Sequence, residues 1–388
     1  MVMNNMKKED VCECIYTGST EPAIEAEHIF PKCIGGVGTL PVGYVADCVN
    51  SAFSKLELGF ARQYPPVVIN RMFSVPMGRK KHRNREKVGL MKDRDNNGEY
   101  MLGFVRNGIP MAIDQIVISM GRSDAQNHGL PVRIVVGPNE KMPKEEQISA
   151  FWEQLKHYNG SPTCIKDLNV PPKTCLLGAV DNRWILCIAK NENPEDIKPK
   201  LKEIVDQITT ASADMLLSQK GPIAHEQRVE AEFSFTFNYV DIMRVYAKIA
   251  VNCLAKVKGH DFVMDSALAE IKQAILTGEN IERYTTYAKG PNPIPESLRN
   301  FPDRVLLGER PHCAVFFQDS QGDLIAFIAL FGTENPIAIK LGRFKERVGV
   351  DFYLCDWEHK ADYTMTDFVL KVCRYDEESE LDIEGTRK

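Results

Sequence analysis

The first clear hydrophobic periodicity of the chain lies near its N-terminus. Phe53, Leu56 and Phe60 recur three or four positions apart within residues 50–62, which places them on one face of a helix. Pro65 starts a pair of prolines just beyond this segment, where the helical pattern stops. The pattern therefore predicts one short amphipathic helix over these residues.

The middle of the chain alternates between two kinds of hydrophobic pattern. Three short runs of apolar and β-branched residues are typical of strands, and they cover residues 116–119, 132–136 and 184–189. Two longer segments, residues 145–158 and 194–219, repeat apolar side chains at helical spacing. This mixture predicts a region that contains both helices and strands.

A third set of patterns follows the middle region. Three phenylalanines alternate with polar residues over residues 233–237, which predicts a strand with one buried face. Asp241 then caps a helical repeat that ends at Gly259, and a second helix is expected over residues 265–276. Two apolar runs joined by a turn within residues 312–331 predict a β-hairpin.

Together these patterns predict an α+β protein with more than one core. The chain has 388 residues, and its hydrophobic content of 44% is enough to offset the entropy lost on ordering. The expected segments are a first domain over 1–75, a basic linker over 76–98, a mixed α/β middle domain over 99–222, a C-terminal α+β domain over 223–375 and an acidic tail over 376–388.

Composition and charge exclude several classes of protein. The ordinary balance of charged and apolar residues argues against disorder, and Gly and Pro follow no fibrous repeat. No apolar run approaches the roughly 20 residues of a membrane-spanning helix, and no secretory leader is recognisable, so a cytoplasmic protein without a membrane partner is expected. A net charge of −5 argues against a generally basic nucleic-acid binder. The 11 cysteines are an odd number, as expected for reduced thiols.

The residues that suggest chemistry cluster in the first sixth of the chain. Glu27 and His28 form an acid–histidine pair, which is followed by an aliphatic residue, an aromatic residue and Pro31. A Gly-Gly turn comes next, and a pair formed by Asn50 and Ser51 stands 22 residues after the histidine. The combination is far more specific than an isolated Glu-His pair.

This combination, EHIFPKCIGG followed by NSAFSKLE, resembles the HNH endonuclease family over about residues 12–62. The resemblance implies a ββα-metal domain, in which a β-hairpin and a helix surround one divalent ion. It implies that His28 is the general base that activates water, a task that suits an imidazole at neutral pH. Glu27 and Asn50 are the implied metal ligands, and Asn50 is also assigned to catalysis. Mg²⁺ or Mn²⁺ is the implied cofactor, because both ions prefer oxygen ligands.

Two features depart from the family pattern. Family members often carry two Cys-x-x-Cys pairs that bind a structural zinc, and both pairs are broken here, the first by Thr17 and the second at residues 46–49. A closed zinc site needs four ligands, so no structural zinc is expected. The alternative is a metal bound by Cys12, Cys14, Cys33 and Cys48. The central Asn of the family motif has no counterpart among residues 37–45.

Two residues of the predicted helix admit a structural role as well. Asn50 is a good N-cap, and this role is compatible with metal ligation only if the side chain turns inward. Glu57 lies one helical turn beyond Phe53 and could reach towards the metal. An exposed helix carboxylate is the simpler interpretation of Glu57.

A run of basic residues follows the nuclease-like block, over residues 79–87. Its cations would bind DNA phosphates with salt-sensitive affinity, and a solvated linker explains the same charges equally well. The candidate nucleic-acid-binding residues are Arg79, Lys80, Lys81, Arg83 and Arg85.

Most of the chain follows this block and carries fewer functional signals. The R-x-x-x-K-I-A-x-N pattern over residues 244–252 and the later LIAFIALFG run are similar to C-terminal regions of other bacterial proteins of this HNH branch. No Walker-type phosphate loop occurs, so a built-in NTP motor is not expected. The region is expected to control activation or target choice through an activating ligand or a protein partner.

Two functions from different classes follow from the sequence. The first is a metal-dependent endonuclease that hydrolyses DNA, with RNA as the less favoured substrate, in bacterial restriction or anti-phage defence. A homodimer fits this function, because one active site cuts one strand. The second is a catalytically degenerate HNH-fold module that binds nucleic acid or protein.

Overall fold

The computed structural model shows a protein of mixed helices and sheets, which confirms the α+β class. The described residues are 13–21, 23–73, 87–93, 99–106, 108–119, 132–137, 142–166, 168–180, 183–210, 229–288, 307–332 and 336–373. The chain divides into two compact units, of which unit 1 comprises residues 1–71, 75–82 and 236–388 and unit 2 comprises 72–74 and 83–235. The nuclease-like block and the C-terminal region, which the sequence patterns separate, therefore belong to the same unit.

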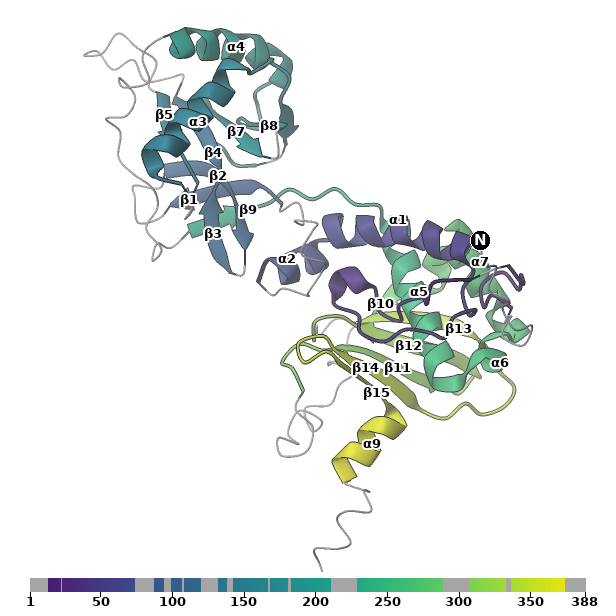
Figure 1. The fold of residues 1–388 in the computed structure, drawn as a ribbon. Coiled ribbons are helices and arrows are strands. Elements are labelled where there is room, and N and C mark those ends of the chain that lie inside the picture. Colours follow the sequence, from purple (N-terminus) through teal and green to yellow (C-terminus); the bar gives the residue numbers. More distant parts are fainter. Residues whose placement is uncertain are drawn as a thin grey trace, which may run out of the picture. The chain divides into compact units, whose positions relative to one another are not determined.

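The N-terminal part of unit 1 is a long loop that leads into a helix (Figure 1). The loop contains a short 3-10 helix, η1 (Lys32–Ile34), and one antiparallel bridge between His28 and Thr39. The helix is α1 (Asp47–Gln63), and α2 (Pro65–Phe73) follows it. This arrangement places the acid–histidine pair on the loop and the candidate Asn on the helix.

The helix α1 begins three residues earlier than the sequence pattern predicts. Its N-cap is Ala46, which offers no side-chain cap, and the first turn contains Asp47 instead. The Asp47 carboxylate accepts a hydrogen bond of 3.0 Å from the backbone N–H of Ile24. The helix start is thus held by the preceding loop, and Asn50 lies inside the helix and does not cap it.

The centre of unit 1 is the helix α5 (Tyr239–Lys258), whose residues 242–255 are buried almost without interruption. Its N-cap is Asn238, whose side chain accepts a 3.0 Å hydrogen bond from the Val240 N–H, so the predicted cap at Asp241 is wrong by three positions. Short helices follow it: α6 (His260–Val263), η3 (Ser266–Leu268), α7 (Ala269–Thr277) and η4 (Ile281–Arg283). The predicted second helix corresponds to η3 and α7.

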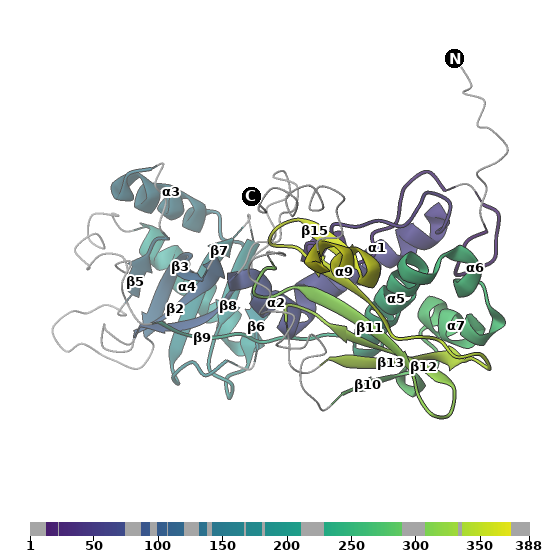
Figure 2. The same ribbon diagram turned by 90° about the horizontal axis from the view of Figure 1, so that it is seen from below.

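An antiparallel sheet of six strands completes unit 1 (Figure 2). In spatial order its strands are β10 (Thr285–Tyr287), β13 (Ile337–Arg343), β12 (Asp323–Ala329), β11 (His312–Gln318), β14 (Asp351–Asp356) and β15 (Ala361–Thr364). The predicted hairpin is confirmed as β11 and β12, which pair with Cys313 opposite Ala329. A last helix, α9 (Met365–Cys373), contacts β14 and β15.

One hydrophobic core joins these parts of unit 1. The helix α5 contacts α1 on one side and the strands β11 to β14 on the other. The core contains Ile29 and Phe53 from the N-terminal block together with Ile249 from α5 and Phe316 from the sheet. The N-terminal block therefore does not have a hydrophobic core of its own, which is the physical reason why it shares a unit with the C-terminal region.

Unit 2 contains two further sheets and two helices among the described residues. The first sheet has the order β3 (Ile109–Ala112), β2 (Glu99–Arg106), β1 (Gly89–Asp93) and β9 (Val229–Glu232). The second has the order β5 (Val132–Val135), β4 (Asp114–Ser119), β7 (Thr174–Val180), β8 (Arg183–Cys187) and β6 (Thr163–Ile165). The helices are α3 (Lys144–Lys156) and α4 (Pro194–Thr210).

Most elements predicted for the middle region exist, and one predicted strand next to it does not. The three predicted strands correspond to β4, β5 and β8, and both predicted helices are present, although residues 211–219 lie outside the described part. Residues 233–238 form no strand, and Phe237 is 39% exposed. The strand lies just before them, as β9, because the pairing partner β1 meets the chain at residues 229–232.

Candidate functional site

The acid–histidine pair lies on a tightly bonded turn of the N-terminal loop. The backbone N–H of Leu40 donates to the Glu27 carbonyl at 2.8 Å, and the N–H of Ile29 donates to the Gly38 carbonyl at 3.0 Å. These bonds flank the antiparallel bridge at His28. Among the described residues of this loop, regular strand pairing is limited to this one bridge. The bridge fixes the direction in which the Glu27–His28 pair faces.

Glu27 forms a buried ion cluster with two residues from distant parts of the chain. The Lys248 ammonium, on α5, binds both the Glu27 carboxylate and the carboxylate of Glu57 on α1. Lys248 is 1% exposed, and its ammonium lies 5.3 Å from the centre of the Phe53 ring. The interpretation of Glu57 as an exposed helix carboxylate is therefore wrong: its side chain faces the site and is 17% exposed.

The cluster contains more negative than positive charge. Two carboxylates face a single ammonium, so full ionisation leaves one negative charge in excess. Burial raises the pKa of Glu27 above its ordinary value, although the nearby Lys248 ammonium opposes this shift. Burial lowers the pKa of Lys248, but Glu57 and Glu27 raise it by more, so Lys248 stays charged. A cluster of this kind favours the approach of a further cation.

A second residue of α5 holds the backbone of the histidine. The Asn252 side-chain amide donates a 3.0 Å hydrogen bond to the His28 carbonyl, and its oxygen accepts a 2.7 Å bond from the Tyr16 hydroxyl. Asn252 is fully buried. With the bonds of Glu27 and Ile29 described above, the backbone around His28 is held on both sides.

The His28 imidazole has, within the described part of the chain, a ring nitrogen without a hydrogen-bond partner, whereas the His28 backbone is bonded on both sides. The ring is half-buried, and its Nδ1 has no hydrogen-bond partner among the described residues. Burial lowers the pKa of His28, and the positive charge of Lys32 adds to this effect. The imidazole is therefore neutral at pH 7, which is the protonation state that a general base requires.

Asn50 lies in the first turns of α1, on the face that also carries Phe53 and Glu57. Residues three and seven positions apart share one face of a helix, and this face is the one that contacts Lys248. Seven residues of helix correspond to about 10 Å along the axis, so Asn50 and Glu57 are separated along the site. No hydrogen bond joins the Asn50 side chain to Glu27 or His28 among the described residues.

The cysteines of the N-terminal block are dispersed. The Cys14 sulfur accepts a 3.4 Å bond from the Ala46 N–H, and Cys33 lies 3.7 Å from the Glu57 carbonyl. Cys48 is exposed and donates to the Glu21 carboxylate at 3.0 Å, while Cys12 lies outside the described residues. Within the described part of the chain, no group of three or more His, Cys, Asp or Glu side chains has the arrangement of a metal site.

Two donor types at the site match those that a hard divalent ion prefers. A carboxylate from Glu27 and an amide oxygen from Asn50 are oxygen ligands of the kind that Mg²⁺ and Mn²⁺ take, with water molecules completing the shell. In the structure the Glu27 carboxylate binds the Lys248 ammonium, and no hydrogen bond joins it to Asn50 among the described residues. Glu27 and Asn50 are the residues that would hold the ion that the family resemblance implies.

The predicted DNA-binding residues Arg79, Lys80, Lys81, Arg83 and Arg85 all lie outside the described residues. The end of the basic run, Lys87, is described and belongs to unit 2. Its ammonium lies 4.9 Å from the centre of the Phe235 ring, and burial lowers its pKa. Lys87 therefore packs against an aromatic ring instead of standing free in solvent.

Sequence analysis missed the roles of Lys248 and Asn252, although one signal pointed to them. Together with Arg244 they are polar residues spaced four apart within the largely apolar stretch 242–255, so they share one face of α5. Arg244 closes α7 by donating to the carbonyls of Ile275 at 2.8 Å and Leu276 at 2.6 Å. From one face of α5, Arg244 thus binds the end of α7, Lys248 binds two carboxylates and Asn252 binds the backbone of His28.

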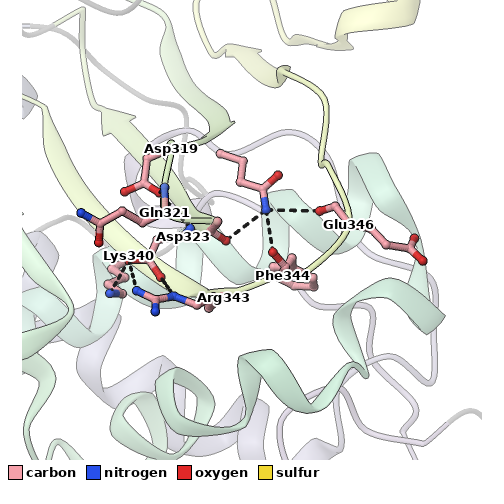
Figure 3. Close-up of polar contacts among 9 residues, drawn as sticks. Asp319, Gln321, Asp323, Lys340, Arg343, Phe344 and Glu346 are labelled. Atoms are coloured by element: carbon pink, nitrogen blue, oxygen red, sulfur yellow. Dashed lines mark hydrogen bonds and ion pairs between the residues drawn. The ribbon is translucent and has the colours of Figure 1, made fainter.

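Figure 3 shows another polar cluster, at the turn between β11 and β12, that we assign to structure. Asp323 is 5% exposed and accepts bonds from Lys340 at 2.6 Å and Arg343 at 2.8 Å. These two partners hold the pKa of Asp323 well below its usual range. Asp319 closes the turn by accepting from the Asp323 N–H at 2.9 Å. The charges of Asp323, Lys340 and Arg343 join β12 to β13, and the Asp319 carboxylate holds the turn.

Comparisons with protein-family models, curated proteins and solved structures found no match. Among the described residues, no helix has the length and the apolar character needed to cross a membrane. Glu27, His28 and the motif that contains them therefore remain the features of this chain that point to a function.

Proposed function

We propose that this chain is a metal-dependent endonuclease of the HNH type that hydrolyses DNA phosphodiester bonds. One juxtaposition supports the proposal best: the His28 imidazole, whose pKa is lowered by burial and whose buried Nδ1 has no hydrogen-bond partner among the described residues, lies near the Glu27 and Glu57 carboxylates, which share one ammonium. A general base and a cation site are the two requirements of phosphodiester hydrolysis by this route.

In this mechanism His28 removes a proton from water, and the water oxygen bonds to phosphorus as the bond to the leaving sugar oxygen breaks. A divalent ion, which Glu27 and Asn50 would hold, would supply positive charge to offset the charge that develops on the phosphate and the leaving oxygen. The turn bonds at Glu27 and Ile29 hold the backbone that carries the imidazole.

Plasmid cleavage by the purified chain tests the proposal. With Mg²⁺ or Mn²⁺ we expect nicked or linear DNA, and EDTA abolishes the reaction. His28→Ala lowers the rate by about 100-fold or more, which is the usual contribution of a general base. His157→Ala is the matched control, because His157 is an exposed residue at the end of α3 in unit 2. Cleavage by His28→Ala at the unaltered rate refutes the assignment.

One observation favours a second candidate function, a degenerate module that binds nucleic acid or protein without cutting. The Lys248 ammonium already binds Glu27, so this carboxylate is paired without a metal ion. This function predicts DNA or protein binding that EDTA does not change, and no cleavage with any divalent ion. The plasmid assay and a binding titration with and without EDTA separate the two functions.

A further inference from the structure

The helix α5 makes its polar contacts with the two residues that matter most in the candidate site. Lys248 binds the side chain of Glu27, and Asn252, one turn further along the helix, binds the backbone of His28. Asn252 and His28 are separated by 224 residues in the sequence. Two consecutive residues of the loop are therefore fastened to two successive turns of one distant helix.

We propose that Lys248 and Asn252 are positioning residues of the Glu27–His28 site, so that helix α5 is an integral part of the endonuclease centre. This inference rests on the proposed function. It replaces the expectation of a C-terminal region that only controls activation or target choice with a site that is complete only when both ends of unit 1 are present.

The geometry supports a positioning role for both side chains. Lys248 joins Glu27 of the loop to Glu57 of α1, so it sets the separation between the loop and the helix that flank the site. Asn252 binds the His28 carbonyl and leaves the imidazole untouched. Both residues are buried, at 1% and 0% exposure, so neither can contact a DNA substrate directly. Their effect must reach the substrate through Glu27 and His28.

Tyr16 provides a matched control within the same network. Its hydroxyl donates to the Asn252 oxygen, on the side of the amide that faces away from His28. Tyr16→Phe removes this bond and leaves the bond between Asn252 and His28 in place. A role in stability alone predicts a lower free energy of unfolding with an unchanged kcat in both variants, whereas a positioning role predicts that Asn252→Leu also lowers kcat.

The experiment measures kcat and KM for plasmid nicking by the full chain with Mn²⁺. We expect Asn252→Leu and Lys248→Met each to lower kcat about 10- to 100-fold, the usual effect of losing a partner that orients a catalytic group. We expect an unchanged KM for DNA in these variants. The kcat of Tyr16→Phe should stay within about threefold of that of the unaltered chain. Lys248→Arg, which keeps the positive charge, should have a higher kcat than Lys248→Met. Asn252→Ser, a smaller change, replaces Asn252→Leu if that variant does not fold.

Hydrogen–deuterium exchange gives a second measurement that does not depend on activity. In Asn252→Leu we expect faster exchange in residues 24–40, with unchanged exchange in residues 312–329 of the sheet. Faster exchange with an unchanged kcat overturns the positioning role. Unaltered exchange and unaltered kcat overturn it as well. Absence of cleavage by the unaltered chain refutes the proposed function and this inference together, whereas equal cleavage by the unaltered chain and both variants refutes the inference alone.

Discussion

Lys248 is the residue whose replacement tests the physical account of the site most directly. Lys248→Met keeps the length and most of the volume of the side chain but removes the ammonium that binds Glu27 and Glu57. The two carboxylates, with side chains only 5% and 17% exposed, are then left together without a cation. Removing one partner of a buried ion pair usually lowers the free energy of unfolding by about 3–5 kcal/mol.

The contacts of Lys248 justify a value within this range. Each bond between an ammonium and a carboxylate contributes about 1.5–3 kcal/mol, and the approach to the Phe53 ring adds about 0.5–2 kcal/mol. Burial of the Met side chain and the absence of a desolvated ammonium offset part of this loss. We therefore expect Lys248→Met to destabilise unit 1 by about 4 kcal/mol.

Lys272 is the matched control for this variant. It is a second buried lysine in the same unit, 6% exposed, and its ammonium donates to the backbone carbonyl of Val263. Burial lowers its pKa, and no carboxylate binds it among the described residues. Because Lys272 makes one bond within the described part of the chain, to a neutral carbonyl, Lys272→Met should lower the free energy of unfolding by only about 1–2 kcal/mol.

The assay exploits the distribution of the three tryptophans. Trp357 is the tryptophan of unit 1, and Trp152 and Trp184 belong to unit 2. In a Trp152→Phe/Trp184→Phe background, fluorescence during urea unfolding therefore reports on unit 1. Urea is preferable to guanidinium, because the latter screens the charges under test.

The pH dependence of Lys248→Met adds a signed expectation. The Lys248 ammonium opposes the rise that burial causes in the pKa of Glu27, so its removal raises the folded-state pKa of Glu27 further. Above the ordinary pKa of a glutamate the folded state of the variant then binds more protons than the unfolded state, so the deficit in its unfolding free energy relative to the unaltered chain grows as the pH rises. Equal unfolding free energies for Lys248→Met and Lys272→Met, within 1 kcal/mol at pH 8, would refute the reasoning.

Two further predictions concern the stability of unit 1, measured by the same urea assay. Gly36→Ala should destabilise unit 1 by about 2 kcal/mol or more, because the new Cβ would lie 1.8 Å from the Phe30 carbonyl oxygen. Gly59→Ala lies inside α1, where the nearest contact of the new Cβ is at 3.9 Å, and it should instead stabilise unit 1 by about 0.5–1 kcal/mol. Changes of the same sign in the free energy of unfolding of the two glycine variants would contradict this prediction. Burial lowers the pKa of His312 to about 4. The neutral imidazole therefore stabilises unit 1 fully above pH 6.5, and about 3 kcal/mol of the free energy of unfolding is lost by pH 4. His312→Gln should show a flatter pH dependence in that interval, and an unchanged slope would contradict the assignment.

The parts of the fold that follow from local patterns could be predicted from the sequence. The hairpin of β11 and β12 and the helices α4 and α5 have clear periods of two or 3.6 residues, so neighbouring residues decide their structure. The strand β1 has no such signal. It is short, begins with Gly89 and forms only because β2 and β9 pair with it on both sides. Pairing between distant strands cannot be read from one segment.

The candidate site divides in the same way. Glu27 and His28 stand out because they are adjacent and belong to a recognisable motif. The orientation of Glu57 depends on Lys248, which is 191 residues away, and helical spacing alone cannot distinguish an inward-facing carboxylate from an exposed one. The start of α1 was misplaced because a backbone N–H of the loop binds Asp47, a tertiary contact without a local signature.

The order in which unit 1 is synthesised follows from its assembly from the two ends of the chain. Glu27 and His28 emerge from the ribosome early, whereas Asn252 is made 224 residues after His28. At about 5–20 residues per second this is a delay on the order of 10 to 40 seconds. During that time Glu57 has no ammonium partner, and Phe60 lacks the Tyr246 ring that packs 5.5 Å from it. A growing or truncated chain therefore contains the whole sequence motif before it can assemble the site, which ties the onset of any activity to completion of helix α5.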